Sequence, residues 1–82
     1  MQMPRATLPP ELVNGLDETQ CEDLRVVARA FLGALIAGED RLGAWRAGRA
    51  AYRALRPNEV DEAIDIAVGA MISRVETWIG SI

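Results

Sequence analysis

Apolar residues recur at helical spacing along three stretches of the chain. Between residues 59 and 79 they return every three or four positions, which is the spacing of one face of an α-helix. A second apolar stripe covers residues 19–37, and a third covers residues 41–56, where Pro57 disfavours helix in the residue before it. No stretch alternates apolar and polar residues as a strand does. The pattern predicts an all-α fold with helices over 19–37, 41–56 and 59–79.

The expected helix ends carry residue types that favour them. Thr19 and Glu22 have the spacing of a capping box, and Asn58 precedes a run of acidic residues, as a helix N-cap often does. Gly38 is suited to end the first helix. Connections this short favour antiparallel neighbours. We therefore expect a three-helix bundle, or a helical hairpin with a third helix docked on it.

The N-terminal region differs from the rest of the chain because it contains three prolines. Pro4, Pro9 and Pro10 predict an extended arm, and Pro10 can occupy the first position of a short helical turn that Gly15 ends. The sequence thus divides into an arm over residues 1–16 and a single helical domain over residues 17–82.

The second half of the first helix is apolar on every side. A helix of this kind is normally covered all round, and a chain of 82 residues, half of them hydrophobic, has few elements to cover it. We expect a homodimer whose interface uses the small and apolar residues Ala30, Gly33, Ile36 and Ala37.

Charge is distributed unevenly within a net charge of −3. All nine basic residues are arginines, and residues 41–56 contain five of them and no acid, between two acidic segments. Four of these arginines fall within an arc of about 80° on a helical wheel, with Leu42 inside the arc and two aromatic residues at its margin. The predicted partner-binding residues are Arg46, Arg49, Arg53, Arg56, Trp45 and Tyr52.

Arginine and aromatic side chains are enriched at protein–protein hot spots, and arginine forms paired hydrogen bonds with carboxylates. We therefore expect this arginine face to contact another protein with an acidic surface. An alternative stays open, in which the arginines only pair with acids of the neighbouring helices.

The chain offers little catalytic chemistry. It has no His and no Lys, so the usual general base and the Schiff-base amine are missing. Its one conventional nucleophile, Cys21, falls on the apolar arc of the first helix. No metal motif or phosphate-binding loop is present. We predict that the protein is not an enzyme and uses no cofactor or metal.

The same sequence predicts where the protein resides. A single Cys suits a reducing compartment, the N-terminus lacks the apolar segment of a signal peptide, and no apolar run is long enough to span a bilayer. We expect a cytoplasmic protein with no membrane association.

These features favour a small regulatory or accessory protein that binds another protein stoichiometrically. Inhibitors and modulators of bacterial or phage type, anti-defence proteins among them, share this size and charge, which is an analogy and not a motif. One alternative is a DNA-binding transcriptional regulator that uses the arginine-rich second helix. An isoelectric point near 4.8 argues against nucleic acid, since DNA-binding domains usually exceed about 9. A further alternative is a structural assembly subunit.

Overall fold

A computed structural model describes residues 9–80, and the predicted arm up to residue 8 lies outside the described residues. The described chain is helical and contains no strand, which confirms the all-α class. Its helices are α1 (Pro10–Val13), α2 (Glu18–Ile36), α3 (Arg41–Leu55) and α4 (Asp61–Gly80). The three long helices differ from the predicted ranges by one or two residues, and the short turn after Pro10 forms a fourth helix.

The cap of α2 lies two residues before the predicted one. Asp17 is the N-cap: its carboxylate accepts a hydrogen bond from the Gln20 backbone N–H at 2.7 Å, and the Gln20 side chain accepts one from the Asp17 N–H at 3.0 Å. This is a reciprocal capping box, so the prediction of one from Thr19 and Glu22 is wrong. Both pairs have the same spacing, and Glu22 instead forms an ion pair with Arg25.

Gly38 ends α2 as predicted. Its φ of +97° is the left-handed conformation that glycine adopts without strain. The Gly38 N–H donates to the Leu35 carbonyl and the Glu39 N–H to the Ala34 carbonyl, the two bonds of a Schellman motif. Asp40 then caps α3 by accepting from the Gly43 N–H at 2.8 Å. The chain therefore reverses direction within a few residues.

The predicted cap of the last helix is wrong. Asn58 lies in the turn before α4, and the first backbone bond at this end runs from the Ile64 N–H to the Val60 carbonyl. The acids Asp61 and Glu62 still occupy the first turn, where the positive end of the helix dipole stabilises their negative charges.

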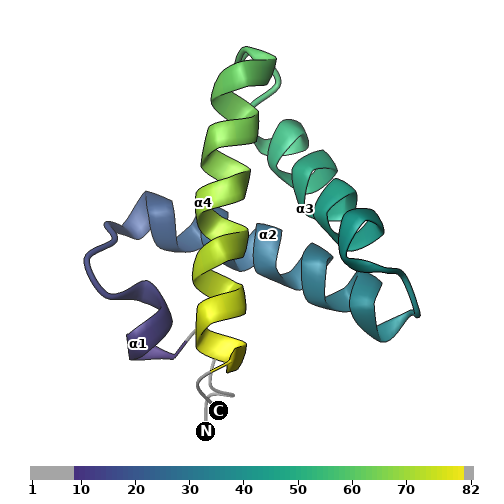
Figure 1. Ribbon diagram of the computed structural model, residues 1–82. Helices are drawn as coiled ribbons and strands as arrows, with labels where there is room; N and C mark the ends of the chain where they lie inside the picture. Colours follow the sequence, from purple (N-terminus) through teal and green to yellow (C-terminus); the bar gives the residue numbers. More distant parts are fainter. Residues whose placement is uncertain (1–8, 81–82) are drawn as a thin grey trace, which may run out of the picture.

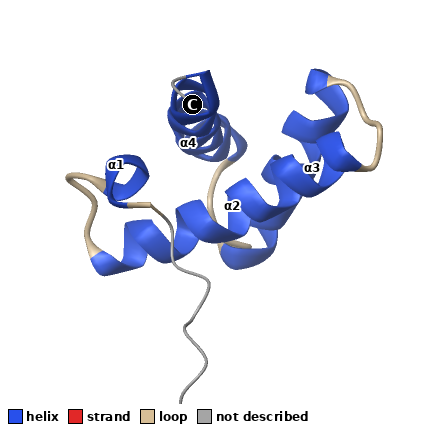
Figure 2. Ribbon diagram, turned by 90° about the horizontal axis from the view of Figure 1, so that it is seen from below, coloured by secondary structure: helices blue, strands red, loops and turns tan. Residues whose placement is uncertain are grey.

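The helices form a hairpin of α2 and α3 with α4 docked across it. In Figure 1, α4 crosses α2 instead of lying alongside it, and Figure 2 shows α4 nearly end-on while α2 runs across the view. The short helix α1 packs against α4, where the Arg74 guanidinium donates to the carbonyls of Leu12 and Asn14 at 3.1 and 2.9 Å. These two carbonyls lie at the end of α1, so Arg74 attaches that helix to α4.

One hydrophobic core lies where the long helices meet. A Cβ atom added to Gly48 of α3 would lie 3.3 Å from side-chain atoms of both Val27 in α2 and Ile72 in α4. Glycine at this position therefore lets three helices approach closely. The buried hydrophobic residues are Leu12, Leu24, Val27, Ala28, Phe31, Ala44, Tyr52, Ile64, Val68, Ile72 and Val75.

Candidate partner-binding surface

Ion pairs join the arginines of α3 to the acids of α4. Arg49 Nε donates to Asp65 at 2.5 Å and lies 3.4 Å from Asp61 through Nη2, and Arg53 pairs with Asp61 as well. At the other end of the seam Arg41 forms two hydrogen bonds with Glu76, at 2.6 and 2.8 Å. Arginines that come later in α3 pair with acids that come earlier in α4. The two helices are therefore antiparallel and joined at both ends.

These contacts shift the ionisation of the acids. The Arg41 guanidinium, hydrogen-bonded to Glu76, holds the pKa of that carboxyl below its ordinary value. Arg53, and Arg49 after it, lower the pKa of Asp61 in the same way. Both carboxylates therefore stay charged at lower pH than free side chains, and the seam remains ionic throughout the neutral range.

Arg56 makes a different contact, because its partner belongs to α2. Its Nη2 donates to the Asp23 carboxylate at 2.7 Å, and the side chain of Asp23 is only 11% exposed. Arg56 is also the C-cap residue of α3. A largely buried acid is thus neutralised by the residue that ends the next helix, and this arginine holds α3 to α2.

Arg46 differs from the other three predicted arginines. Its side chain is exposed, and within residues 9–80 it forms no ion pair. Leu42, one turn earlier on the same side of α3, is 55% exposed, and Trp45 beside it is half-buried against the core. We call Leu42, Trp45 and Arg46 the outer face of α3.

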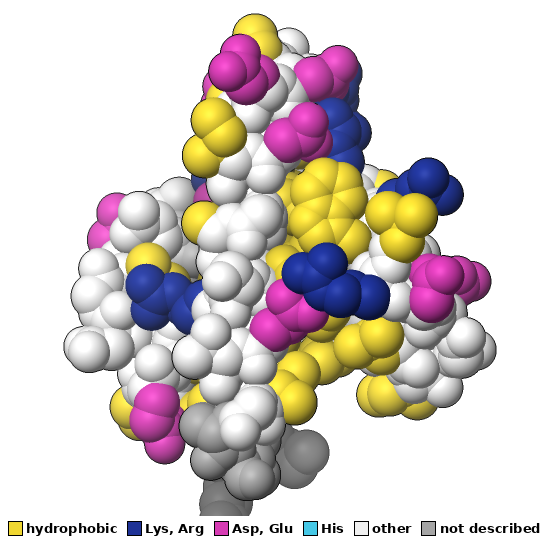
Figure 3. Space-filling view, in the orientation of Figure 1, with side chains coloured by type: hydrophobic (Ala, Val, Ile, Leu, Met, Phe, Trp, Pro, Cys, Tyr) yellow, Lys and Arg dark blue, Asp and Glu magenta, His cyan; other side chains and the backbone are white. Residues whose placement is uncertain are grey.

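The space-filling view shows the surface where α3 and α4 meet. Hydrophobic side chains fill the angle between α3 and α4, and basic and acidic side chains lie beside one another along it (Figure 3). Sequence reasoning did not include Leu42 among the binding residues, although it falls inside the arginine arc. The helical wheel places Leu42 among the arginines, but periodicity alone does not distinguish an exposed apolar contact residue from an interruption of a basic surface.

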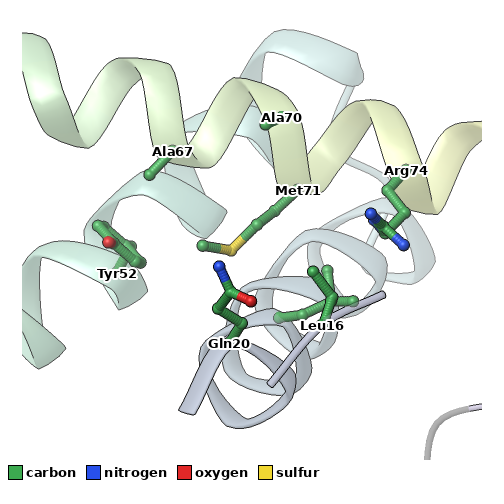
Figure 4. A pocket seen from close by; sticks show the side chains of 8 residues that line it. Leu16, Gln20, Tyr52, Ala67, Ala70, Met71 and Arg74 are labelled. Carbon is green, nitrogen blue, oxygen red and sulfur yellow. The ribbon is translucent and has the colours of Figure 1, made fainter. Parts of the chain in front are cut away.

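Tyr52 lies in the core and not on the exposed surface of α3. It is 8% exposed and belongs to the core, where it lines a cavity of about 290 Å³ together with residues of α2 and α4. Figure 4 shows the Met71 side chain extending from α4 toward the side-chain amide of Gln20. Gln20 and Arg74 line this cavity too. The Gln20 side chain already accepts a hydrogen bond from the Asp17 N–H, and Arg74 already donates one to the Leu12 carbonyl. This cavity therefore belongs to the packing of α2 and α3 against α4.

The predicted dimer residues lie at the C-terminal end of α2. Gly33, Ile36 and Ala37 are exposed and Ala30 is half-buried. A Cβ atom on Gly33 would meet no other atom within 4 Å. Ile36 is 87% exposed, which is the largest value among the exposed large hydrophobic residues in the described part of the chain.

Other site types are not evident in the described residues. Residues 9–80 contain no group of three or more His, Cys, Asp or Glu side chains that could hold a metal ion. In that same range, no helix combines the length and the apolar character needed to cross a bilayer. No family model matches this chain, and no curated protein or solved structure is significantly similar to it.

Proposed function

We propose that this protein is a small, non-enzymatic regulatory or accessory protein that acts by binding another protein stoichiometrically through the outer face of α3. The observation that carries the proposal is the combination of Leu42, Trp45 and Arg46 on one helix surface. A half-buried tryptophan and an arginine without an ion pair among the described residues are of the types enriched at interface hot spots, and the exposed leucine beside them adds apolar surface that a partner can bury.

The partner should present an acidic group beside an apolar depression. Arg46 is free to form a bidentate hydrogen bond with a carboxylate, and Leu42 has apolar surface to bury. Arg49 and Arg53 border this face, but their guanidinium groups are already paired with Asp61 and Asp65. Arg49 and Arg53 therefore attract an acidic partner only weakly, since the acids of α4 offset their charge.

The same pairing disfavours the DNA-binding alternative. A recognition helix needs arginines that are free to contact phosphates or bases. In α3, Arg49 and Arg53 face carboxylates of α4, and Arg56 faces Asp23. Acids so close to these arginines would repel a phosphate backbone.

A comparison of tagged baits tests the proposal in the native host. We expect wild-type bait to recover a partner in fixed stoichiometry and the double variant Leu42→Asp, Arg46→Glu to lose it while remaining folded. The matched control is Arg29→Glu, since Arg29 is also exposed and also forms no ion pair within residues 9–80. This control has the same charge change as Arg46→Glu and should retain the partner.

A folded double variant that retains every partner would overturn the proposed surface. Recovery of nucleic acid in place of protein, lost on raising the salt concentration, would support the DNA-binding alternative instead. Recovery of the chain alone, in higher oligomers, would support the structural-subunit alternative.

A further inference from the structure

We propose that two copies of this chain dock reciprocally, with Ile36 of each copy inserting into an apolar hollow between α2 and α4 of the other. This self-association is independent of the proposed function, because it uses a different surface from the outer face of α3.

Ile36 has the geometry of an inserting side chain. It is the last residue of α2 and is 87% exposed, so almost all of its apolar surface contacts water. On the same side of α2, one turn earlier, Gly33 has no atom within 4 Å of the position a Cβ would take. The backbone of a second copy can therefore approach the helix closely there, and the side chain of the neighbouring Ala37 is only a methyl group.

The receiving hollow is lined by Leu35, the residue before Ile36 in the chain. It has a volume of about 320 Å³, and Phe31 and Leu35 of α2 and Ile79 of α4 form its apolar lining. Leu35 and Ile79 keep exposed fractions of 37% and 40%, although both are large aliphatic residues. An aliphatic side chain from outside would cover both of them.

A second copy fits these features better than an unrelated partner does. The inserting residue and the hollow belong to one chain, so a two-fold axis allows each copy to insert and to receive. The rim of the hollow carries the Arg41–Glu76 pair, which presents one positive and one negative group side by side. Across a two-fold axis each charge can face its opposite, whereas a uniformly acidic or basic partner would meet one like charge.

The patch is small compared with stable interfaces, which bury about 800 Å² on each partner. Only Ile36, Leu35 and Ile79 are large exposed hydrophobic residues beside this hollow. The dimer should therefore form reversibly with increasing concentration. Sedimentation equilibrium on the wild-type protein should give a monomer mass at low micromolar concentration and a mass that rises toward the dimer at high micromolar concentration.

Two neutral variants isolate the contact. Ile36→Asn removes the inserting side chain, and Ile79→Asn makes the hollow polar. Both residues are exposed in the single chain, so both variants should fold, which circular dichroism and thermal melts check. Each variant alone should lose dimerisation, because a pair of identical copies then contains no intact contact.

Mixing the two variants is the decisive experiment. The mixed pair contains one intact contact, because the Ile79→Asn copy still supplies Ile36 and the Ile36→Asn copy still has its apolar hollow. We expect the mixture to associate more strongly than either variant alone. Arg46→Glu should dimerise as the wild type does, and Ile36→Asn should keep a partner recruited by the outer face of α3.

Three results would overturn the proposal. The first is a wild-type protein that stays monomeric at the highest soluble concentration. The second is an Ile36→Asn or Ile79→Asn variant that dimerises as strongly as the wild-type protein. The third is a mixture that associates no better than its components, which excludes the reciprocal contact. Loss of dimerisation with retained partner binding would leave the proposed function intact, so the two ideas fail separately.

Discussion

Arg56→Ala should destabilise the fold strongly, although Arg56 is a polar residue at the end of a helix. The substitution leaves the Asp23 carboxylate, 11% exposed, without the guanidinium that lies 2.7 Å from it. Breaking a fully buried ion pair from one side costs about 3–5 kcal/mol because an uncompensated charge remains. Arg56 itself is 34% exposed, so water can partly replace it.

The expected cost lies below the fully buried range. Hydrogen bonds to charged groups contribute about 1.5–3 kcal/mol, and we expect a loss of about 2 kcal/mol for Arg56→Ala. For a domain of this size, such a loss lowers the melting temperature by roughly 8–16 °C. The matched control is Arg46→Ala, the same change on the same helix, which removes no ion pair within the described residues and should stay within about ±0.5 kcal/mol of the wild type.

The effect is measured by thermal and urea unfolding of four variants: Arg56→Ala, Arg46→Ala, Asp23→Ala and the double variant that combines Arg56→Ala with Asp23→Ala. The double variant should recover part of the loss, because no charge is then left buried, giving a coupling free energy above about 1 kcal/mol. Equal melting temperatures for Arg56→Ala and Arg46→Ala would show that the Asp23 carboxylate does not need the Arg56 guanidinium. Additive changes in the free energy of unfolding for Arg56→Ala and Asp23→Ala would likewise show that the two side chains are not coupled.

Three further predictions follow from other contacts. Replacing Arg49 and Arg53 together by Glu should lower the melting temperature, because like charges then meet across the α3–α4 seam, and added salt should reduce the loss. Gly48→Leu should cost more than about 2 kcal/mol by urea unfolding because the site is crowded, whereas Gly33→Leu meets open space and should be neutral or slightly stabilising. Because Glu76 has a lowered pKa in the folded state, its stabilising contribution is complete above about pH 5 and is lost as the pH falls through the folded pKa. The difference in melting temperature between wild type and Glu76→Gln should therefore disappear in acid, and a pH-independent difference would contradict this.

The sequence was sufficient to predict the helices because helical periodicity depends only on neighbouring residues. The stripe of the last helix places Val68, Ile72 and Val75 in the core, where they are buried. Cap residues were less predictable. Asp17 with Gln20 and Thr19 with Glu22 have equal spacing, and the choice between them depends on where the chain turns at Gly15.

The candidate site was harder to predict because it depends on how helices cross. Arg56 and Asp23 are separated by 33 residues, and a helical wheel carries no information on which acid an arginine meets. The wheel places Arg46 and Arg49 in one arc, but only the docking of α4 pairs Arg49 and leaves Arg46 exposed. Tyr52 lies at the margin of that arc and on the core side of α3, so periodicity alone did not separate its two environments.

We propose that the arginines of α3 have two different roles: Arg56 holds the fold together, and Arg46 binds a partner. The most direct test measures two quantities, melting temperature and association rate with the partner that wild-type bait recovers, for alanine variants of Arg46 and Arg56. Arg46→Ala should slow association and leave the melting temperature unchanged, since charge complementarity guides encounter. Arg56→Ala should lower the melting temperature and leave association of the folded fraction unchanged. An Arg46→Ala variant that associates at the wild-type rate, or that melts as early as Arg56→Ala, would contradict this division of roles.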